Sequence, residues 1–260
     1  MSGFSEEWLA LREPLDLAAR NAEVEAVFVG SLPTGPLSLL DLASGAGSTV
    51  AALSPKLGGE AAWRLSDHDP ALLEAAARRW HGEVTVLQVD LARDLESLPF
   101  DDVDGITTSA FLDLVSDAFL RRLVECVVKA GKPFLASLSY DGRTSFAPAH
   151  PFDGTLLAAL NAHQRTDKGF GPSLGPEAAA RAQELFAARG YRVVQGLSDW
   201  NVPHVNRAFL QEFLSGWVRV GRELDLPAAE LEDWWRERTD RIASGELAVT
   251  VGHVDFAALP

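Results

Sequence analysis

The feature that most constrains the fold is the segment at residues 37–50, which reads LSLLDLASGAGSTV. It opens with a short apolar run closed by small residues, a pattern that predicts a buried strand entering a tight turn. Gly45 and Gly47 allow backbone conformations that a Cβ would forbid, and they let a ligand approach the chain closely. We expect a helix to begin near Ser48, so the loop lies at the carboxyl end of a strand, where open α/β sheets bind their ligands.

Strand and helix patterns alternate along most of the chain after this loop. Further strands are expected at 62–66, 83–89, 105–110, 133–140, 191–197 and 247–256, and helices at 70–80, 116–130, near 154–164, and at 176–189, 206–224 and 228–244. Alternation of this kind implies right-handed crossovers and a mostly parallel sheet with helices on both faces. The sequence therefore predicts a doubly wound α/β fold.

The length of the chain suits one large domain, and we predict a single domain spanning residues 1–260. Residues 1–36 are expected to form an N-terminal helical segment. Residues 141–176 hold glycines, prolines and polar side chains, and we expect a lid or substrate loop there, because long loops in compact domains are usually functional. Residues 204–245 are expected to form a helical insert that acts as a cap before the last strand.

The charge balance is acidic, with a formal net charge of −14 at pH 7 and a pI of about 4.8. Such a field repels phosphate backbones, so nucleic acid is not expected as a partner. No apolar run reaches the ~18 residues of a membrane-spanning helix, and the start of the chain lacks a basic region followed by an apolar one. We therefore expect no membrane association and a cytoplasmic location. Cys126 is the only cysteine, so neither an intrachain disulfide nor a multi-cysteine metal site is expected, and no metal ligand is predicted.

Three aspartates, Asp41, Asp67 and Asp90, each follow an apolar run. In a parallel sheet their carboxylates gather at one edge, where they accept hydrogen bonds from ribose hydroxyls or order a cationic group. This arrangement suits a nucleoside cation better than a pyrophosphate. A dinucleotide site also places an acid on a ribose, but Val50 stands where GxGxxG needs its third glycine. Asp67 and Asp90 each keep a structural alternative, the first as a helix cap and the second as the end of a strand.

Residues 39–47, LLDLASGAG, resemble the first motif of the class I S-adenosylmethionine-dependent methyltransferases, and the chain is most similar to their bacterial small-molecule type. In that motif an acid between apolar residues precedes three alternating glycines, and Ala43 replaces the first glycine here. SDHDPALLEAA at 66–76 is similar to the second motif, QVDLARDLESLPFDDVDGI at 88–106 to the third and the approach to the fourth, and SAFLDLV at 109–115 lies where the fourth motif falls. The resemblance covers roughly residues 37–140 and implies a seven-stranded, Rossmann-like sheet.

The resemblance implies S-adenosylmethionine as cofactor and methyl transfer to an oxygen, nitrogen or carbon of a small-molecule acceptor by in-line displacement, with S-adenosylhomocysteine as product. Asp67 would hold the ribose hydroxyls, and Asp90 and Leu91 would lie near the adenine with His68 beside them. The fourth motif would face both the methionine moiety and the acceptor. The implied cofactor-binding residues are Asp41, Ala43, Ser44, Gly45, Gly47, Asp67, His68, Asp90, Leu91 and Ser109.

Residues for the acceptor are expected in the fourth motif, in the strand after it and in the loop that follows. The candidates for substrate contact are Phe111, Tyr140, Arg165 and Lys168. The two cations of this set suit an anionic substrate group. A general base is optional for methyl transfer, and His163 is the leading catalytic candidate because its unperturbed pKa lies near neutrality, followed by Asp113. The alternative is a solvated loop, with Asp113 an ordinary polar residue between leucines.

Aromatic side chains recur at spacings of four in the helix expected at 206–224. Phe209, Phe213 and Trp217 share one face of this helix, which is typical of packing. We predict that this face belongs to the core or to a homodimer contact through the C-terminal helices. The alternative is a cap over an apolar substrate.

Two other classes of function stay open. A nucleotide-dependent oxidoreductase would use the same sheet, and binding of NAD in place of S-adenosylmethionine would establish it. A non-catalytic relative with this fold would act in assembly or regulation, and it would fold without affinity for the cofactor. Within the methyltransferase hypothesis, a protein substrate is the alternative to a small molecule.

Overall fold

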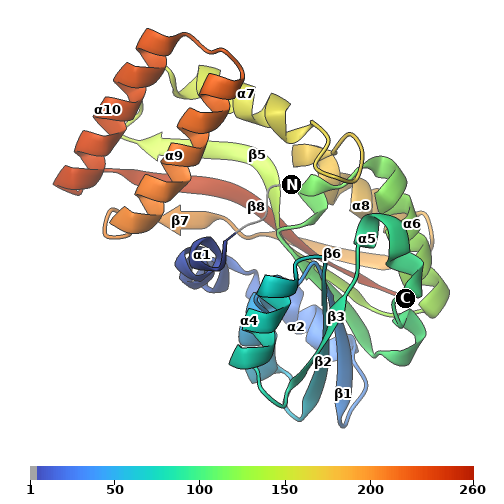
Figure 1. Ribbon diagram of the computed structural model, residues 1–260. Helices are drawn as coiled ribbons and strands as arrows, with labels where there is room; N and C mark the ends of the chain where they lie inside the picture. Colours follow the sequence, from blue (N-terminus) through green and yellow to red (C-terminus); the bar gives the residue numbers. More distant parts are fainter. Residues whose placement is uncertain (1–4) are drawn as a thin grey trace.

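A central eight-stranded sheet organises residues 5–260, the part of the chain that the computed structural model describes (Figure 1). The strand order across the sheet is β3-β2-β1-β4-β5-β8-β6, and β7 pairs with β8. The strands are β1 (Leu37–Leu42), β2 (Ala61–Asp67), β3 (Val84–Gln88), β4 (Gly105–Ser109), β5 (Phe134–Ala147), β6 (Arg192–Leu197), β7 (Trp200–Val202) and β8 (Ala248–Leu259).

Strands β1 to β5 run parallel to one another, whereas β8 runs antiparallel to β5 and β6. This arrangement confirms the doubly wound, mostly parallel α/β fold, and every expected strand is present. The prediction of seven strands was one short within the described chain, because β7 is an additional strand. Trp200–Val202 are too few residues for an alternating pattern, and they form a strand only by pairing with β8.

Strand β5 is longer than its pattern predicts. It was expected to end at Tyr140 but continues to Ala147, so the start of the segment 141–176 is strand and not loop. The extension has a polar sequence without the apolar pattern of a buried strand, so the sequence did not predict it. Backbone pairing with β8 sustains the strand from Thr144 onward, after an irregular stretch that contains Gly142 at φ 88°.

Helices cover both faces of the sheet (Figure 1). They are α1 (Glu6–Ala19), α2 (Ala22–Ser31), α3 (Ser48–Leu53), α4 (Pro70–Arg79), α5 (Leu91–Asp94), α6 (Asp117–Ala130), α7 (Asp153–Gln164), α8 (Ala178–Ala187), α9 (Arg207–Glu223) and α10 (Ala228–Ser244). The expected N-terminal helical segment 1–36 contains α1 and α2, and its residues 1–4 lie outside the described residues. None of the helices between residues 5 and 260 combines the length and apolar character needed to cross a bilayer.

Successive residues of the central strand β1 face opposite sides of the sheet and enter two separate cores. Leu39 packs with Phe28 and Trp63 on one face. Leu40 packs with Ile106 and Phe134 on the other. Because both faces of β1 are buried, its sequence is an almost continuous apolar run rather than an alternating one.

A third core lies where β5, β7 and β8 extend beyond the parallel strands, and α7, α9 and α10 pack on this extension (Figure 1). Phe209 and Trp217 of α9 are buried there, and the rings of Phe209 and Phe213 stack with centroids 5.5 Å apart. The aromatic face of α9 is therefore core, which confirms the packing interpretation. A homodimer through the C-terminal helices stays a prediction.

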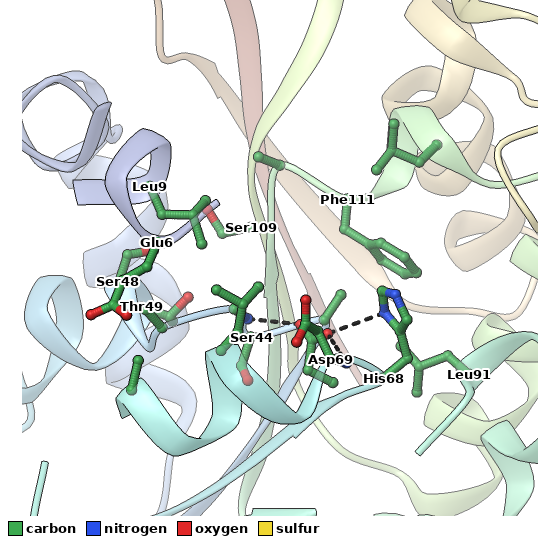
Figure 2. A pocket seen from close by; sticks show the side chains of 18 of the residues that line it. Glu6, Leu9, Ser44, Ser48, Thr49, His68, Asp69, Leu91, Ser109 and Phe111 are labelled. Carbon is green, nitrogen blue, oxygen red and sulfur yellow. Dashed lines mark hydrogen bonds and ion pairs between the residues drawn. The ribbon is translucent and has the colours of Figure 1, made fainter. Parts of the chain in front are cut away.

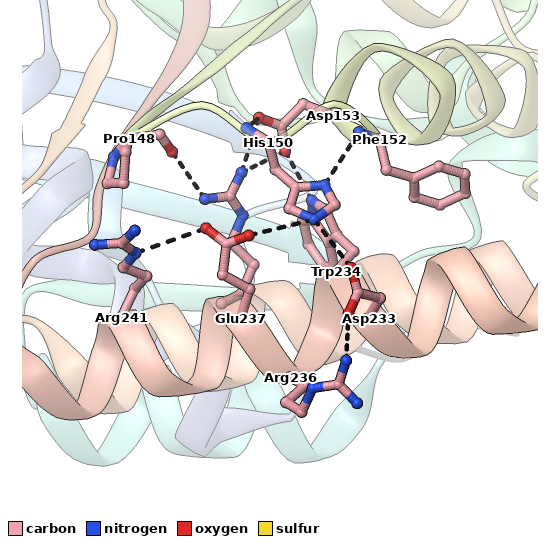
Figure 3. Close-up of polar contacts among 10 residues, drawn as sticks. Pro148, His150, Phe152, Asp153, Asp233, Trp234, Arg236, Glu237 and Arg241 are labelled. Atoms are coloured by element: carbon pink, nitrogen blue, oxygen red, sulfur yellow. Dashed lines mark hydrogen bonds and ion pairs between the residues drawn. The ribbon is translucent and has the colours of Figure 1, made fainter.

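A buried ion pair joins α10 to the start of α7 (Figure 3). One terminal nitrogen of Arg238 donates to both carboxylate oxygens of Asp153, at 2.6 and 2.8 Å, and the other donates to the carbonyl of Pro148 at 2.8 Å. The same carboxylate accepts from Nε1 of Trp234 and from the N–H of His150, both at 2.7 Å. The side chain of Arg238 is fully buried and that of Asp153 is 18% exposed, so the helical insert is held by a charge pair that is largely shielded from solvent.

Candidate functional site

A cavity of about 530 Å³ opens at the carboxyl ends of the parallel strands (Figure 2). Ser44 follows β1, Asp67 ends β2 and Ser109 ends β4, while Glu6 and Leu9 of α1 form a facing wall. Across residues 5–260, no group of three or more His, Cys, Asp or Glu side chains is arranged to hold a metal ion. The cavity has the size of a small-molecule site, and it lies at the sheet edge that the glycine loop predicts.

The loop after β1 has a left-handed backbone at Ala43 (φ 51°), Gly45 (φ 52°) and Gly47 (φ 81°). A Cβ at Gly47 would lie 2.8 Å from Nε1 of Trp80, and a Cβ at Gly45 would lie 3.2 Å from a methyl group of α1. The left-handed backbone favours glycine at both positions, and at Gly47 the contact with Trp80 also leaves no room for a Cβ. Ala43, Ser44 and Gly45 line the cavity, whereas Gly47 serves the contact with Trp80 and does not.

Asp67 ties this loop to the end of β2. Its Oδ2 accepts from the N–H of Gly45 at 2.9 Å, and its Oδ1 accepts from the N–H of Asp69 at 3.0 Å. The cap of α4 is Asp69, which accepts from the N–H of Ala71 at 2.8 Å, so the alternative role of Asp67 as helix cap is wrong. His68 lines the cavity beside it, with Nδ1 3.2 Å from Oδ1 of Asp67 (Figure 2). Each carboxylate oxygen has more than one lone pair, so Asp67 can still accept hydrogen bonds from a ligand.

Asp41 is buried near this loop but does not line the cavity. Its Oδ1 accepts from Oγ1 of Thr107 at 2.7 Å, and its Oδ2 has no partner among the described residues. Desolvation raises the pKa of Asp41 to about 6, against the lowering effects of the Thr107 hydrogen bond and of the Arg20 charge. Arg20 is itself buried and donates to Oγ of Ser109 at 3.2 Å and to Oγ of Ser137 at 3.0 Å. No sequence motif indicated this buried cation, because it comes from the N-terminal helical segment.

The chain after β3 supplies the third aspartate. Asp90 caps α5 by accepting from the N–H of Ala92 at 3.1 Å, and it lines the cavity together with Leu91. Capping and ligand contact are compatible here, since only one carboxylate oxygen makes the cap. Of the expected cofactor contacts, the cavity brings together Ala43, Ser44, Gly45, Asp67, His68, Asp90, Leu91 and Ser109.

Phe111 and Lys168 of the expected substrate set also line the cavity. The ring of Phe111 meets that of Phe170 edge to face, with centroids 5.3 Å apart. The turn that carries Phe170 is held by Oδ1 of Asp167, which accepts from two glycine N–H groups at 2.7 and 3.0 Å. The loop after α7 therefore reaches the cavity and is anchored there by an aromatic contact.

Solved structures share the architecture of this chain. No family model and no curated protein matches the chain. Among solved structures, the YcgJ protein of Bacillus subtilis superposes with a TM-score of 0.51 at 19% identity, covering 92% of this chain and 99% of that one. The cyclopropane synthase MmaA2 of Mycobacterium tuberculosis superposes with a TM-score of 0.52 at 12% identity, covering 98% and 94%.

An N-methyltransferase of Haemonchus contortus, solved with phosphomonomethylethanolamine and S-adenosylhomocysteine, superposes with a TM-score of 0.50 at 13% identity. The alignment covers 99% of this chain and 58% of that one. This chain has the class I methyltransferase fold. Because the identities are low, the likeness establishes the methyltransferase fold and not the reaction.

Two candidates for the acceptor side of the methyltransferase fold, Asp113 and Tyr140, do not line the cavity. Asp113 is buried in a single helical turn after β4, where desolvation raises its pKa to about 6. The hydroxyl of Tyr140 donates to Oδ1 of Asn161 at 2.9 Å, and desolvation raises its pKa to about 12. Their roles in catalysis and acceptor binding stay predictions.

His163 and Arg165, at the end of α7, also lie outside the cavity lining. Nε2 of His163 is 3.5 Å from the carboxylate of Glu223, and desolvation together with the charge of Lys168 lowers the pKa of this histidine. Arg165 pairs with Glu177 at 3.0 Å. Histidine suits a general base and arginine suits an anionic acceptor, but the packing of α7 directs both side chains to other partners. The roles of His163 and Arg165 stay predictions.

Helix α1 contributes a set of cavity residues that no motif of the methyltransferase family indicated. They are Glu6, Leu9, Ala10, Arg12, Glu13 and Asp16. Spacings of three and four place most of them on one helix face, but nothing local shows that this face covers the carboxyl edge of the sheet. Arg79 of α4 is a further missed residue, and both of its terminal nitrogens bind Glu13, at 2.6 and 2.7 Å.

Proposed function

We propose that this chain transfers a methyl group from S-adenosylmethionine to a small-molecule acceptor. The observation that carries the proposal is the glycine loop held by Asp67 at the ends of two adjacent parallel strands, with Asp90 at the end of the next. These carboxylates suit a nucleoside, while the loop at 43–49 holds no lysine or arginine that would favour a pyrophosphate. The S-adenosylhomocysteine bound to the structurally similar N-methyltransferase supports the same cofactor.

The residues present fit this cofactor. Asp67 would accept hydrogen bonds from the ribose hydroxyls, and Asp90, Leu91 and His68 would border the adenine. Oγ of Ser44 is buried without a partner in the described chain and belongs to a cavity-lining residue, so it is free to bond the methionine moiety. A buried hydroxyl left unbonded is costly, which is why such a group indicates a ligand.

Bound S-adenosylmethionine supplies a methyl group activated by its sulfonium centre. The contribution of the chain is alignment of the two reactants. Ser109 is oriented by its hydrogen bond from Arg20, and Phe111 with Phe170 forms an apolar wall near the end of β4. No proton transfer is assigned to His163, because it does not contact the cavity.

Helix α1 limits the size of the acceptor. This helix forms one wall of the cavity, and its Leu9 approaches the glycine loop closely. The helix encloses the cavity on this side, and the cavity volume of about 530 Å³ suits a small molecule. The geometry therefore favours a small molecule over a protein substrate.

Calorimetric titration with S-adenosylmethionine and S-adenosylhomocysteine tests the proposal, with NAD as the control ligand. We expect both adenosyl ligands to bind in the micromolar range and NAD not to bind. Binding of NAD alone would replace the proposal with an oxidoreductase. A folded sample that binds none of the three would indicate a non-catalytic relative.

A further inference from the structure

The cavity contains a cation that the cofactor contacts described above do not use. Arg12 of α1 lines the cavity, and its side chain is 11% exposed. Its Nε donates to Oδ2 of Asp16 at 2.8 Å. Within residues 5–260, neither terminal nitrogen of Arg12 has a hydrogen-bond acceptor, and neither is sealed from solvent. The outer edge of the guanidinium is therefore available to a ligand in the cavity.

The orientation of this guanidinium is set by its neighbours. Asp16 is buried, and its second oxygen accepts from Nε1 of Trp200 at 3.0 Å. The guanidinium carbon of Arg12 lies 5.6 Å from the centroid of the Trp200 ring. A carboxylate on one edge and an aromatic face beside it hold a planar cation in place, so little side-chain entropy remains to be lost on binding.

The other cations that line the cavity are already engaged. Both terminal nitrogens of Arg79 bind the carboxylate of Glu13, at 2.6 and 2.7 Å. Nζ of Lys168 lies 3.3 Å from Nδ1 of His163, and desolvation lowers the pKa of this lysine. Arg12 thus differs from them, because both of its outer nitrogens are free within the described chain.

The position of Arg12 separates it from the nucleoside contacts. Asp67 and Asp90 stand at the ends of β2 and β3, on one side of β1 in the sheet. Trp200, beside Arg12, belongs to β7, which pairs with β8 beyond β5 on the other side. Helix α1 packs against β7 (Figure 1), so Arg12 lies toward the end of the cavity that the nucleoside leaves open.

A neighbouring histidine does not add to the positive charge here. The His253 ring lies 4.7 Å from that of Trp200, and burial together with the charge of Arg12 lowers its pKa to about 3. His253 is therefore neutral at physiological pH, and Arg12 is the cation of this group. Its acidic neighbours are Asp16, which accepts from its Nε, and the buried Asp113, whose pKa the charge of Arg12 lowers against the larger effect of desolvation.

We propose that the methyl acceptor carries a carboxylate, which Arg12 binds through its two free terminal nitrogens. The planar fork of an arginine matches the two oxygens of a carboxylate, and Phe111 and Phe170 supply apolar surface for the body of the molecule. This inference rests on the proposed function. It names the class of acceptor, a small apolar carboxylic acid.

The test uses acids and their uncharged primary amides, which have nearly the same shape. Benzoate with benzamide, phenylacetate with phenylacetamide, and indole-3-acetate with indole-3-acetamide are titrated by ligand-observed NMR into protein saturated with S-adenosylhomocysteine. We expect at least one acid to bind about ten- to one-hundredfold more tightly than its amide, since a charge-assisted pair is lost in the amide. Arg12→Gln, whose amide can still donate to Asp16, should abolish this preference.

Two further variants make the result specific. Arg12→Lys keeps the charge without the fork and should retain only part of the preference. The double variant Arg79→Met with Glu13→Gln removes both partners of the other ion pair in the cavity. It should leave the preference for acids over amides unchanged. Equal losses in this control and in Arg12→Gln would mean that the effect is general to the charge of the cavity, which would overturn the proposal.

The same carboxylate chemistry is present in the methionine part of the cofactor, and the two sources are distinguishable. Arg12→Gln should leave the affinities for S-adenosylhomocysteine and for 5′-methylthioadenosine, which lacks the amino acid, unchanged. A loss confined to S-adenosylhomocysteine would assign Arg12 to the cofactor and overturn the proposal. The proposal would also be overturned if the wild type showed no preference for acids over amides, or if Arg12→Gln kept that preference.

Failure of the proposed function itself has a separate signature. It would appear as absent binding of S-adenosylhomocysteine to the wild type. The acid and amide titrations are therefore also made without S-adenosylhomocysteine. A preference that depends on Arg12 but occurs in protein that binds no adenosyl ligand would leave a carboxylate site without a methyltransferase.

Discussion

Replacing Asp67 with alanine tests the cofactor site at its central residue. The carboxylate would hold the ribose hydroxyls, and charge-assisted hydrogen bonds of this kind contribute about 1.5–3 kcal/mol. We therefore expect the dissociation constant of S-adenosylhomocysteine to rise about ten- to more than one-hundredfold. The change also removes the acceptor of the N–H groups of Gly45 and Asp69, so the free energy of unfolding should fall by about 1–3 kcal/mol.

Asp69→Ala is the matched control for this experiment. It removes the same charge from a residue that also lines the cavity, but the carboxylate of Asp69 serves as the cap of α4. Loss of such a cap costs about 1 kcal/mol of stability. The affinity for S-adenosylhomocysteine should stay close to that of the wild type.

Calorimetric titration gives the affinities, and urea denaturation gives the stabilities of the same samples. A tenfold or greater loss in Asp67→Ala with little change in Asp69→Ala would support the ribose contact. An unchanged affinity in folded Asp67→Ala, or equal losses in both variants, would refute it.

Three further predictions concern the packing beneath and around the site. Arg238→Met removes the charge-assisted hydrogen bonds to Asp153, which is 18% exposed and keeps its bonds from Trp234 and His150, so urea denaturation should show a loss of about 1.5–3 kcal/mol, and a loss below about 1 kcal/mol would contradict this reasoning. Gly47→Ala places a Cβ 2.8 Å from Nε1 of Trp80 at a left-handed backbone position, so the melting temperature should fall by several degrees, and an unchanged value would count against the contact. Desolvation raises the pKa of Asp41 from 3.8 to about 6, so the folded chain binds this proton more tightly than the unfolded chain, and stability falls as pH rises through this interval. The stability of Asp41→Asn relative to the wild type should therefore be greater near pH 7 than near pH 4, and a pH-independent difference would show that the residue does not titrate in this way.

The nucleoside half of the site was predictable from local sequence. Gly45, Asp67 and Asp90 stand at or just beyond the ends of apolar runs that the sequence shows directly. Parallel strands bring their carboxyl ends to one edge of a sheet, so residues at those ends meet whatever the remaining topology. This is why most of the expected cofactor contacts line one cavity.

The capping roles within this half were harder to assign. Asp67 and Asp69 lie two residues apart in the same short segment, and both are suitable helix caps by type. Only the backbone geometry shows that Asp69 caps α4 while Asp67 bonds the glycine loop. Local sequence placed the pair at the edge of the cavity, and the turn between strand and helix decided which carboxylate bonds the glycine loop and which caps α4.

The acceptor half depends on segments that are distant in the chain. Arg12 gains its neighbour Trp200 only because α1 packs against β7. Strand β7 in turn exists only by pairing with β8, and the polar end of β5 extends for the same reason. His163 and Arg165 have suitable chemistry, but the packing of α7 directs them to other partners.

The sequence by itself therefore determined the doubly wound sheet, the glycine loop and the acids around it. These features follow from periodic burial and from the glycines of a single turn, and both act over a few residues. The tertiary structure alone decided which helix covers the cavity and which arginine remains free in it. The physical reason is that the placement of a helix is settled by the apolar faces it meets, and those faces belong to distant strands.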